Sequence, residues 1–159
     1  MTTNAIGTAN VLDALKSLNK KVVAVMITSD KAYDNVEWVW GYRETDRLGG
    51  KDPYSASKGM AELVIRSYVE SFFKHPNSNI RVGITRAGNV IGGGDWAIDR
   101  IVPDCMEAWS SGKAVDIRSP NATRPWQHVL EPLSGYLVLA ADLAHRGKNH
   151  GEAYNFGPS

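Results

Sequence analysis

Two short runs of β-branched and apolar residues constrain the fold of this chain most strongly. Residues 22–28 read VVAVMIT and residues 80–85 read IRVGIT, so both runs are apolar on both faces or nearly so. Strands that face water on one side alternate apolar and polar residues, whereas strands covered by helices on both sides do not. The sequence therefore predicts two parallel strands in a sheet that helices cover on both faces.

Helical patterns surround the two predicted strands. Apolar residues recur at helical spacing in Asn4–Leu18 and in Pro53–Phe73. Asp52 is suited to cap the second helix, and Pro53 fits its first turn. Further along, the sequence predicts a helix around Ile101–Ser110, a brief strand near Val115–Ile117, a helix from about Glu131 to Ala144, and an extended AYNF segment. This order favours an α/β fold with a doubly wound, Rossmann-like parallel sheet.

Composition narrows the partners of the chain. The length of 159 residues and the 43% apolar content suit one soluble globular domain, and the net charge of +1 is spread without blocks. We therefore expect a small-molecule partner and neither nucleic acid nor membrane. Cys105 is the single cysteine and the four histidines are scattered, so we expect a cytoplasmic protein with no metal site. No signal peptide and no apolar run long enough to span a bilayer are visible.

The segment from Asp30 to Asp52 is long and irregular for a compact domain, and such segments often carry function. It contains Trp38, Trp40 and Tyr42. A lid packed by its own aromatic side chains and a surface that contacts a substrate ring are equally compatible with this composition.

Tyr54 and Lys58 are candidates for acid–base chemistry. They lie four residues apart in the predicted helix and therefore share a face, where the ammonium can approach the phenol oxygen. A nearby cation favours the phenolate, which makes tyrosine a usable proton acceptor. Chance also produces this spacing in helices that carry a solvated lysine and a packed tyrosine.

The sequence TSDK, residues 28–31, directly follows the first predicted strand. Open α/β sheets bind ligands in the crevice beyond the carboxyl ends of their strands. Ser29, Asp30 and Lys31 would place a hydroxyl donor, an acid and a possible base there. The alternative is a turn held by side-chain hydrogen bonds of Ser29 and Asp30, with Lys31 as a surface charge.

Together these stretches resemble a known family. TSDKAYDN, WVWGYRE, DPYSASKG, RAGNVIGGGDW, RPWQHVLEPLSGY and YNFGPS resemble the extended short-chain dehydrogenase/reductases that act on nucleotide sugars, and most closely the 4,6-dehydratases of the CDP-sugar branch. The resemblance covers essentially the whole chain. It implies NAD as cofactor and conversion of a CDP-linked glucose into a 4-keto-6-deoxy sugar nucleotide.

The resemblance also implies roles for individual residues. Tyr54 would take the proton of the C4 hydroxyl, and Lys58 would support the phenolate and hold the nicotinamide ribose. Ser29 would donate to the C4 oxygen, and Asp30 would protonate the departing C6 hydroxyl. Lys31 stands where relatives that use dTDP-glucose carry a glutamate, which removes the C5 proton. An amine can do so only when it is neutral, and burial would favour that state.

Two residues are candidates for holding the diphosphate of the substrate. Arg124 offers a planar fork of donors, and Asn89 follows a predicted strand with an amide able to donate. A surface arginine and a turn asparagine are the alternatives. The glycine-rich GGGDWA, residues 92–97, is not a dinucleotide fingerprint, because six residues separate it from the strand and Asp95 would face the pyrophosphate. A mobile substrate loop is the preferred interpretation.

The resemblance places the glycine-rich NAD loop of the family in an earlier βαβ unit, so we expect this chain to be a fragment that lacks it and also lacks the carboxyl-terminal end. Residues 1–90 would form the second half of a dinucleotide-binding domain, and residues 91–159 part of a substrate-binding region with returning Rossmann elements. Alone, such a chain should bind NAD weakly and have no activity. A nucleotide-sugar 4-epimerase and a non-catalytic remnant that pairs with itself or with a complementing chain are the alternatives.

Overall fold

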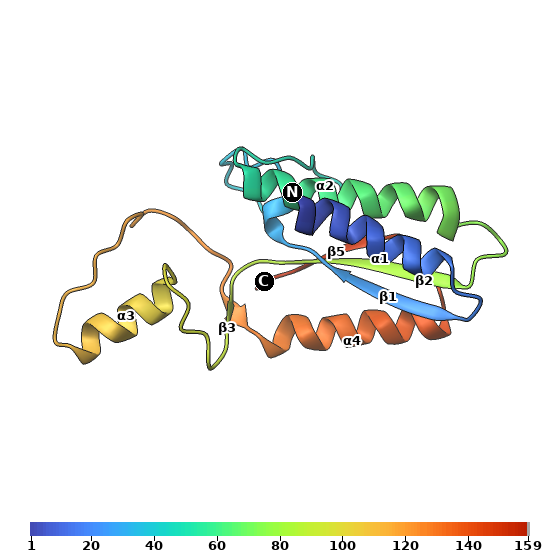
Figure 1. Cartoon of the computed structure of the whole chain (residues 1–159). Coiled ribbons are helices and arrows are strands. Elements are labelled where there is room, and N and C mark those ends of the chain that lie inside the picture. Colours follow the sequence, from blue (N-terminus) through green and yellow to red (C-terminus); the bar gives the residue numbers. More distant parts are fainter. Residues whose placement is uncertain (159) are drawn as a thin grey trace.

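The chain forms an α/β structure, and a computed structural model describes residues 1–158 (Figure 1). Its helices and strands are α1 (Gly7–Lys16), β1 (Val22–Ile27), α2 (Pro53–Tyr68), β2 (Ile80–Ala87), β3 (Val90–Ile91), α3 (Ile101–Ser110), β4 (Gln127–His128), α4 (Leu130–His145) and β5 (Ala153–Phe156). Three short helical turns accompany them: η1 (Thr2–Ile6), η2 (Asp30–Ala32) and η3 (Val69–Phe73).

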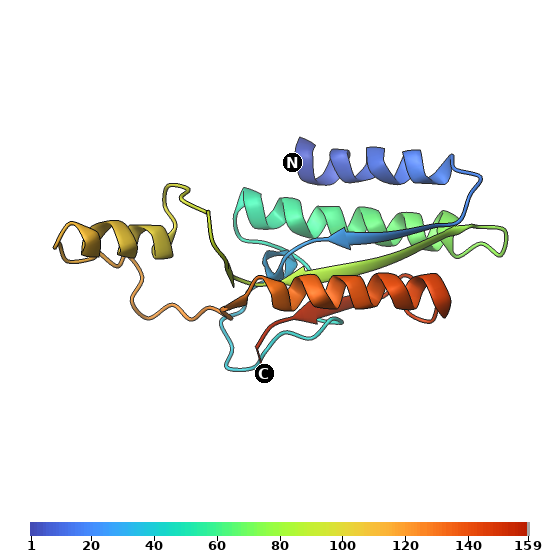
Figure 2. The same ribbon diagram turned by 90° about the horizontal axis from the view of Figure 1, so that it is seen from below.

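The sheet has the strand order β1-β2-β5, and both pairings are parallel. Val22 pairs with Ile80 at one end of the first ladder, and Ile27 pairs with Thr85 at the other. Helices α1 and α2 cover one face of this sheet and α4 covers the other (Figures 1 and 2). The prediction of a Rossmann-like α/β fold with parallel strands is therefore confirmed.

The core between the sheet and the first helix layer is apolar and closely packed. Leu12 of α1, Ile65 of α2 and Phe73 of η3 are buried against Val82 and Ile84 of β2. Each such side chain contributes roughly 1.5–3 kcal/mol through removal of its apolar surface from water. This layer fixes α2, the helix that carries Tyr54 and Lys58, against the central strand.

On the other face of β2, the approach of α4 depends on a glycine. A Cβ atom added to Gly83 would lie 2.8 Å from Leu139 Cδ2 and 2.9 Å from Leu143 Cδ1. Leu139 and Leu143 are buried on α4. A side chain at position 83 would therefore push α4 away from the sheet.

Helix α2 begins as the sequence predicts. The Asp52 carboxylate accepts hydrogen bonds from the backbone N–H groups of Tyr54 and Ser55, at 2.8 and 3.0 Å, and Pro53 occupies the first turn. These bonds satisfy amides that have no partner within the helix. The predicted helical stretch 53–73 is also confirmed, because η3 continues α2 through Phe73.

A long excursion, residues 90–128, leaves the sheet after β2 and carries α3 away from the helical layers (Figure 1). Helix α3 lies where the sequence predicts it, but the predicted strand at Val115–Ile117 is wrong, since those residues are irregular. They lie in the excursion, where no edge of the main sheet is within reach. The excursion instead begins and ends at a two-residue ladder of β3 and β4 that the sequence did not indicate.

None of the helices within residues 1–158 has the length and apolar character needed to cross a bilayer.

Candidate active site

The predicted site residues gather at the edge of the sheet where the parallel strands end. In Figure 1 the chain leaves β1, turns through η2 and reaches the amino end of α2 at this edge, and α4 begins at the same edge. Ser29 caps η2: its Oγ accepts a hydrogen bond from the Lys31 N–H at 3.2 Å and donates to Asp30 Oδ1 at 3.0 Å. The alternative of a turn held by its own side chains is thus also realised, and it presents the hydroxyl beside the carboxylate.

Asp30 connects this turn with the end of β2. A Cβ atom added to Gly88 would lie 3.3 Å from Asp30 Oδ2 and would overlap the ring of Pro125. The bare backbone at Gly88 therefore lets the carboxylate and the Pro125 loop approach together. Three segments that are distant along the chain thus meet at Gly88, and Asn89 and Arg124 flank this point in the sequence.

Tyr54 and Lys58 project from the first turns of α2, as predicted. The Lys58 Nζ lies 5.7 Å from the centroid of the Tyr54 ring. The Tyr54 side chain is 57% exposed and its hydroxyl donates to no side chain within residues 1–158, so it is accessible to a ligand. Helix α2 packs against η2 next to these residues. The candidate acid Asp30 on η2 and the candidate base Tyr54 on α2 therefore belong to two elements that are in contact.

Lys31 departs from what its assigned role would need, because the structure leaves its side chain exposed rather than buried. It lies close to the amino end of α2. Hydrogen bonds from the Ser55 hydroxyl and N–H hold the pKa of Asp52 below its usual value, and the charge of Lys31 lowers it further.

The two candidate phosphate ligands differ in their surroundings. Asn89 is partly buried, and its backbone carbonyl accepts a hydrogen bond from Gln127 N–H at 3.2 Å. Arg124 is exposed, and its Nη1 donates to the carbonyl of the adjacent Thr123 at 2.7 Å. The guanidinium is therefore presented to solvent with most of its donors unused.

A buried ion pair below this edge was missed by the sequence analysis. Glu62 of α2 and Arg86 of β2 form a two-bond contact, Nε to Oε1 at 2.7 Å and Nη2 to Oε2, with both side chains fully buried. Burial by itself would lower the pKa of Arg86, but bonds and charge from Glu62 and Tyr33 outweigh it and raise the pKa above its usual value. Arg86 is therefore a permanent cation. No local sequence pattern signals the pair, because the burial of both residues follows only from the packing of α2 on β2.

The aromatic segment between η2 and α2 packs on itself. The Tyr42 ring stacks on Tyr33 with centroids 5.0 Å apart, and Trp38 lies against Tyr42 at 5.5 Å. Trp40 is 72% exposed. The segment is therefore packed in part by its own aromatic side chains, and its contact with a substrate ring stays a prediction.

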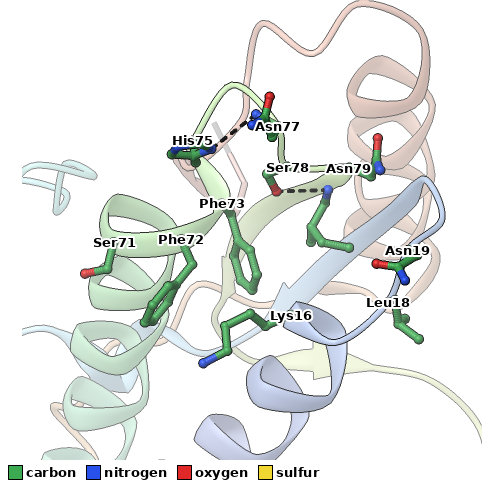
Figure 3. Close-up of a pocket in the computed structure, with 11 residues that line it drawn as sticks. Lys16, Leu18, Asn19, Ser71, Phe72, Phe73, His75, Asn77, Ser78 and Asn79 are labelled. Atoms are coloured by element: carbon green, nitrogen blue, oxygen red, sulfur yellow. Dashed lines mark hydrogen bonds between the residues drawn. The ribbon is translucent and has the colours of Figure 1, made fainter.

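A cavity of about 330 Å³ lies at the opposite end of the sheet (Figure 3). It is bordered by the turns that precede β1 and β2, including Asn19 and Asn77, and by Lys16 and Phe72. Parallel α/β sheets bind ligands beyond the carboxyl ends of their strands, not at this end. The chemistry-bearing residues therefore mark the better candidate site. Within residues 1–158, no group of three or more potential metal ligands is assembled.

Residues 92–97 also behave as expected for a loop. They are exposed, and α3 begins only at Ile101, so the strand–turn–helix context of a dinucleotide fingerprint is missing there.

Comparison with known proteins decides the family. Residues 1–157 match the family model described as NAD dependent epimerase/dehydratase family. The chain belongs to this family. The CDP-glucose 4,6-dehydratase of Salmonella typhimurium is 52% identical over 159 residues, which cover 98% of this chain and 44% of the relative. The family resemblance seen in the sequence is thereby confirmed.

Solved structures of a nucleotide-sugar dehydratase and of an epimerase share the fold. A dTDP-glucose 4,6-dehydratase of Streptomyces venezuelae with NAD bound superposes with a TM-score of 0.78 at 25% identity, covering 98% of this chain and 44% of that one. A UDP-glucuronic acid 4-epimerase of Bacillus cereus superposes with a TM-score of 0.81 at 21% identity, covering 99% and 47%. The chain spans less than half the length of these relatives.

Proposed function

We propose that this chain carries catalytic residues of an NAD-dependent nucleotide-sugar 4,6-dehydratase that converts CDP-glucose into CDP-4-keto-6-deoxyglucose and water. The observation that carries the proposal is the packing of the Ser29–Asp30–Lys31 turn against the helix that presents Tyr54 and Lys58. The 52% identity to the Salmonella CDP-glucose 4,6-dehydratase favours CDP-glucose among nucleotide sugars.

The residues at this edge fit part of an NAD site. A phenol and an ammonium that share one helix face are donors suited to the hydroxyls of a nicotinamide ribose; the Tyr54 side chain is exposed and Lys58 is half-buried. When bound, NAD supplies a hydride acceptor at C4 of the sugar and returns the hydride to C6. Tyr54 and Lys58 would hold its ribose in this chain.

The protons of the reaction can be followed on named atoms. Tyr54 Oη takes the proton of the C4 hydroxyl as C4 is oxidised, with Lys58 stabilising the phenolate. The new carbonyl acidifies the C5–H, and Lys31 accepts that proton as a neutral amine. Asp30 then gives its proton to the C6 hydroxyl, so that the C6–O bond breaks and water leaves. Lys31 returns its proton to C5 as the hydride enters C6, and proton exchange with solvent restores Tyr54 and Asp30. Ser29 would donate its hydroxyl to the C4 oxygen in place of its present bond to Asp30 Oδ1.

Lys31 requires a change of surroundings to act as this base. It is exposed near Asp52 in the present structure. A bound sugar ring that covers Lys31 would remove water from the amine and favour its neutral form. Arg124 and Asn89, beside the approach of Pro125 to Gly88, would hold the diphosphate of the same substrate.

A hybrid enzyme tests the proposal. The 159 residues replace the matching region of the Salmonella relative, and the product formed from CDP-glucose with NAD is identified by mass spectrometry and NMR. We expect the 4-keto-6-deoxy product, and its loss in Tyr54→Phe. A folded, NAD-binding hybrid that yields no such product refutes the proposal.

The same assay addresses the alternatives. A C4 epimer as the product would establish the 4-epimerase, which needs no acid for elimination. Formation of a stable complex by the isolated chain, combined with an inactive hybrid, would establish the non-catalytic remnant. For the working enzyme we propose a cytoplasmic homo-oligomer or an assembly with a complementing chain.

A further inference from the structure

We infer that the buried Glu62–Arg86 pair is a positioning device that sets the Ser29–Asp30 turn against the helix of Tyr54 and Lys58. The inference rests on the proposed function for its catalytic meaning. Its structural content, that this pair holds the turn at the sheet edge, stands on the contacts alone.

Glu62 joins the two elements that bear the candidate acid and base. It lies one helical turn after Lys58 on α2, and its Oε1 accepts a hydrogen bond from Thr28 Oγ1 at 2.6 Å. Thr28 immediately precedes Ser29. A carboxylate on the helix therefore binds the last residue before the turn, and a shift of α2 along its axis would break this bond.

Arg86 extends the contact to the other side of the turn. Its Nη1 donates to the Tyr33 hydroxyl at 2.7 Å and to the Glu44 carbonyl at 3.0 Å. The Tyr33 hydroxyl in turn donates to Asn155 Oδ1 on β5 at 2.7 Å. The turn is thus fixed on both flanks, at Thr28 by Glu62 and at Tyr33 by Arg86.

Energetics argue that stability is not the main role of the pair. Removing two charges from water costs free energy that their attraction scarcely repays, and apolar replacements of similar volume are often neutral or stabilising. Both side chains are fully buried here. A bidentate contact between a planar guanidinium and a carboxylate does, however, fix distance and angle, which apolar contacts do not.

The double variant Glu62→Leu/Arg86→Met tests the inference in the full chain. Most partners stay satisfied, because Thr28 Oγ1 also donates to the Thr85 carbonyl at 3.0 Å and Tyr33 keeps Asn155. We expect the urea midpoint of unfolding to be that of the wild type or higher. Exposed Glu70, which pairs with Lys74, supplies the matched control Glu70→Leu.

Native-state amide exchange gives the readout. The Ala32 and Tyr33 amides bond within the turn, and the Gly49 amide bonds to the Ala32 carbonyl. We expect these three to exchange at least about tenfold faster in the double variant, since the turn opens locally without global unfolding. The Lys74 and Gly151 amides, remote from the pair, should keep their rates. Unchanged rates at the turn, or equal acceleration everywhere, would overturn the inference.

Tyr33→Phe keeps the inference testable if the double variant fails to fold. It preserves the ring that stacks on Tyr42 and removes only the hydroxyl that Arg86 and Asn155 share. We expect faster exchange at Ala32 and Gly49, with a smaller change than in the double variant. No change there would contradict the inference.

In the hybrid enzyme, the same double variant should lower kcat by at least about tenfold and change KM for CDP-glucose less than about twofold, because misplacement of reacting groups costs rate while the diphosphate ligands stay in place. A raised KM with unchanged kcat would contradict positioning. An inactive parent hybrid would refute the proposed function, and the exchange experiment would still decide on the positioning device.

Discussion

The two parts of the candidate site are held in opposite ways. The turn of Ser29 and Asp30 rests on a buried network of charged and polar groups, whereas residues 91–100, early in the excursion, are exposed throughout, and Arg124 later in it is exposed as well. In Figure 2 helices lie on both sides of the main sheet, whereas α3 extends away from it. The difference indicates that the turn carrying the proposed acid is preorganised, whereas Arg124, a proposed diphosphate ligand, is not held in place by other side chains of residues 1–158.

The largest loss of stability is expected from a change in the buried ion pair that holds the Ser29–Asp30 turn. Glu62→Leu alone leaves the Arg86 guanidinium buried without its counter-ion, and we expect a loss of about 3–5 kcal/mol of unfolding free energy. Denaturant unfolding measures it. Glu70→Leu, at an exposed pair, should change stability little. A loss in Glu62→Leu no larger than in this control would show that the pair is not desolvated.

The next largest loss of stability is expected where α4 packs against the sheet. Gly83→Ala puts a methyl group 2.8 Å from Leu139, and overpacking of this kind costs about 1–3 kcal/mol. Gly93 in the excursion has no atom near an added Cβ, so Gly93→Ala is the matched control and should be close to neutral. If Gly83→Ala and Gly93→Ala changed the unfolding midpoint equally, the packed sheet and the excursion would not differ in tolerance to an added methyl group.

A smaller effect concerns pH. His150 accepts a hydrogen bond from Val82 N–H through Nδ1 at 3.0 Å, and burial, assisted by Arg81 and Lys74, lowers its pKa. The unfolded chain therefore binds a proton at higher pH than the folded chain. Stability should be constant above about pH 6.5 and fall as the pH drops below it.

Unfolding curves across this pH range measure the dependence on His150. The variant His150→Gln should flatten the loss below about pH 6.5, whereas His145→Gln, at an exposed position, should retain it. An identical slope in wild type and His150→Gln would contradict the assignment.

The smallest effect is expected in the excursion. Arg118 and Asp99 form an exposed pair at 3.0 Å. Arg118→Ala should change the free energy of unfolding by less than about 0.5 kcal/mol, because exposed pairs gain little over hydration. A loss above about 1 kcal/mol in a denaturation experiment would show that the excursion is tied to the rest of the chain more strongly than its contacts indicate.

The same contrast explains which features could be predicted from the sequence. The two-sided apolar runs of β1 and β2 and the cap at Asp52 are local patterns with direct structural meaning, and the structure confirms them. Val115–Ile117 has the composition of a strand, but strand formation needs a partner, and these residues pair with neither sheet of the described structure. The two-residue ladder of β3 and β4 is too short to leave a pattern.

The position of the candidate site could be predicted from the sequence, but the buried ion pair beneath it could not. TSDK after a strand and Tyr54 at a helix start both follow from local sequence. Glu62 and Arg86, in contrast, are 24 residues apart, and each alone suggests a solvated charge. Only the packing of α2 on β2 shows that they meet. Exposure of Lys31 likewise depends on what covers the turn, which no local pattern specifies.

One measurement tests the central claim, that acid and base of a dehydration share this edge, most directly. In the hybrid enzyme, Asp30→Asn is mixed with CDP-glucose and NAD in a single turnover, and NADH absorbance and product are followed together. We predict that NADH forms and the 4-keto-6-deoxy product does not, because C4 is oxidised by way of Tyr54 while the C6 hydroxyl lacks its proton donor. Dehydration at the unmutated rate would contradict the account.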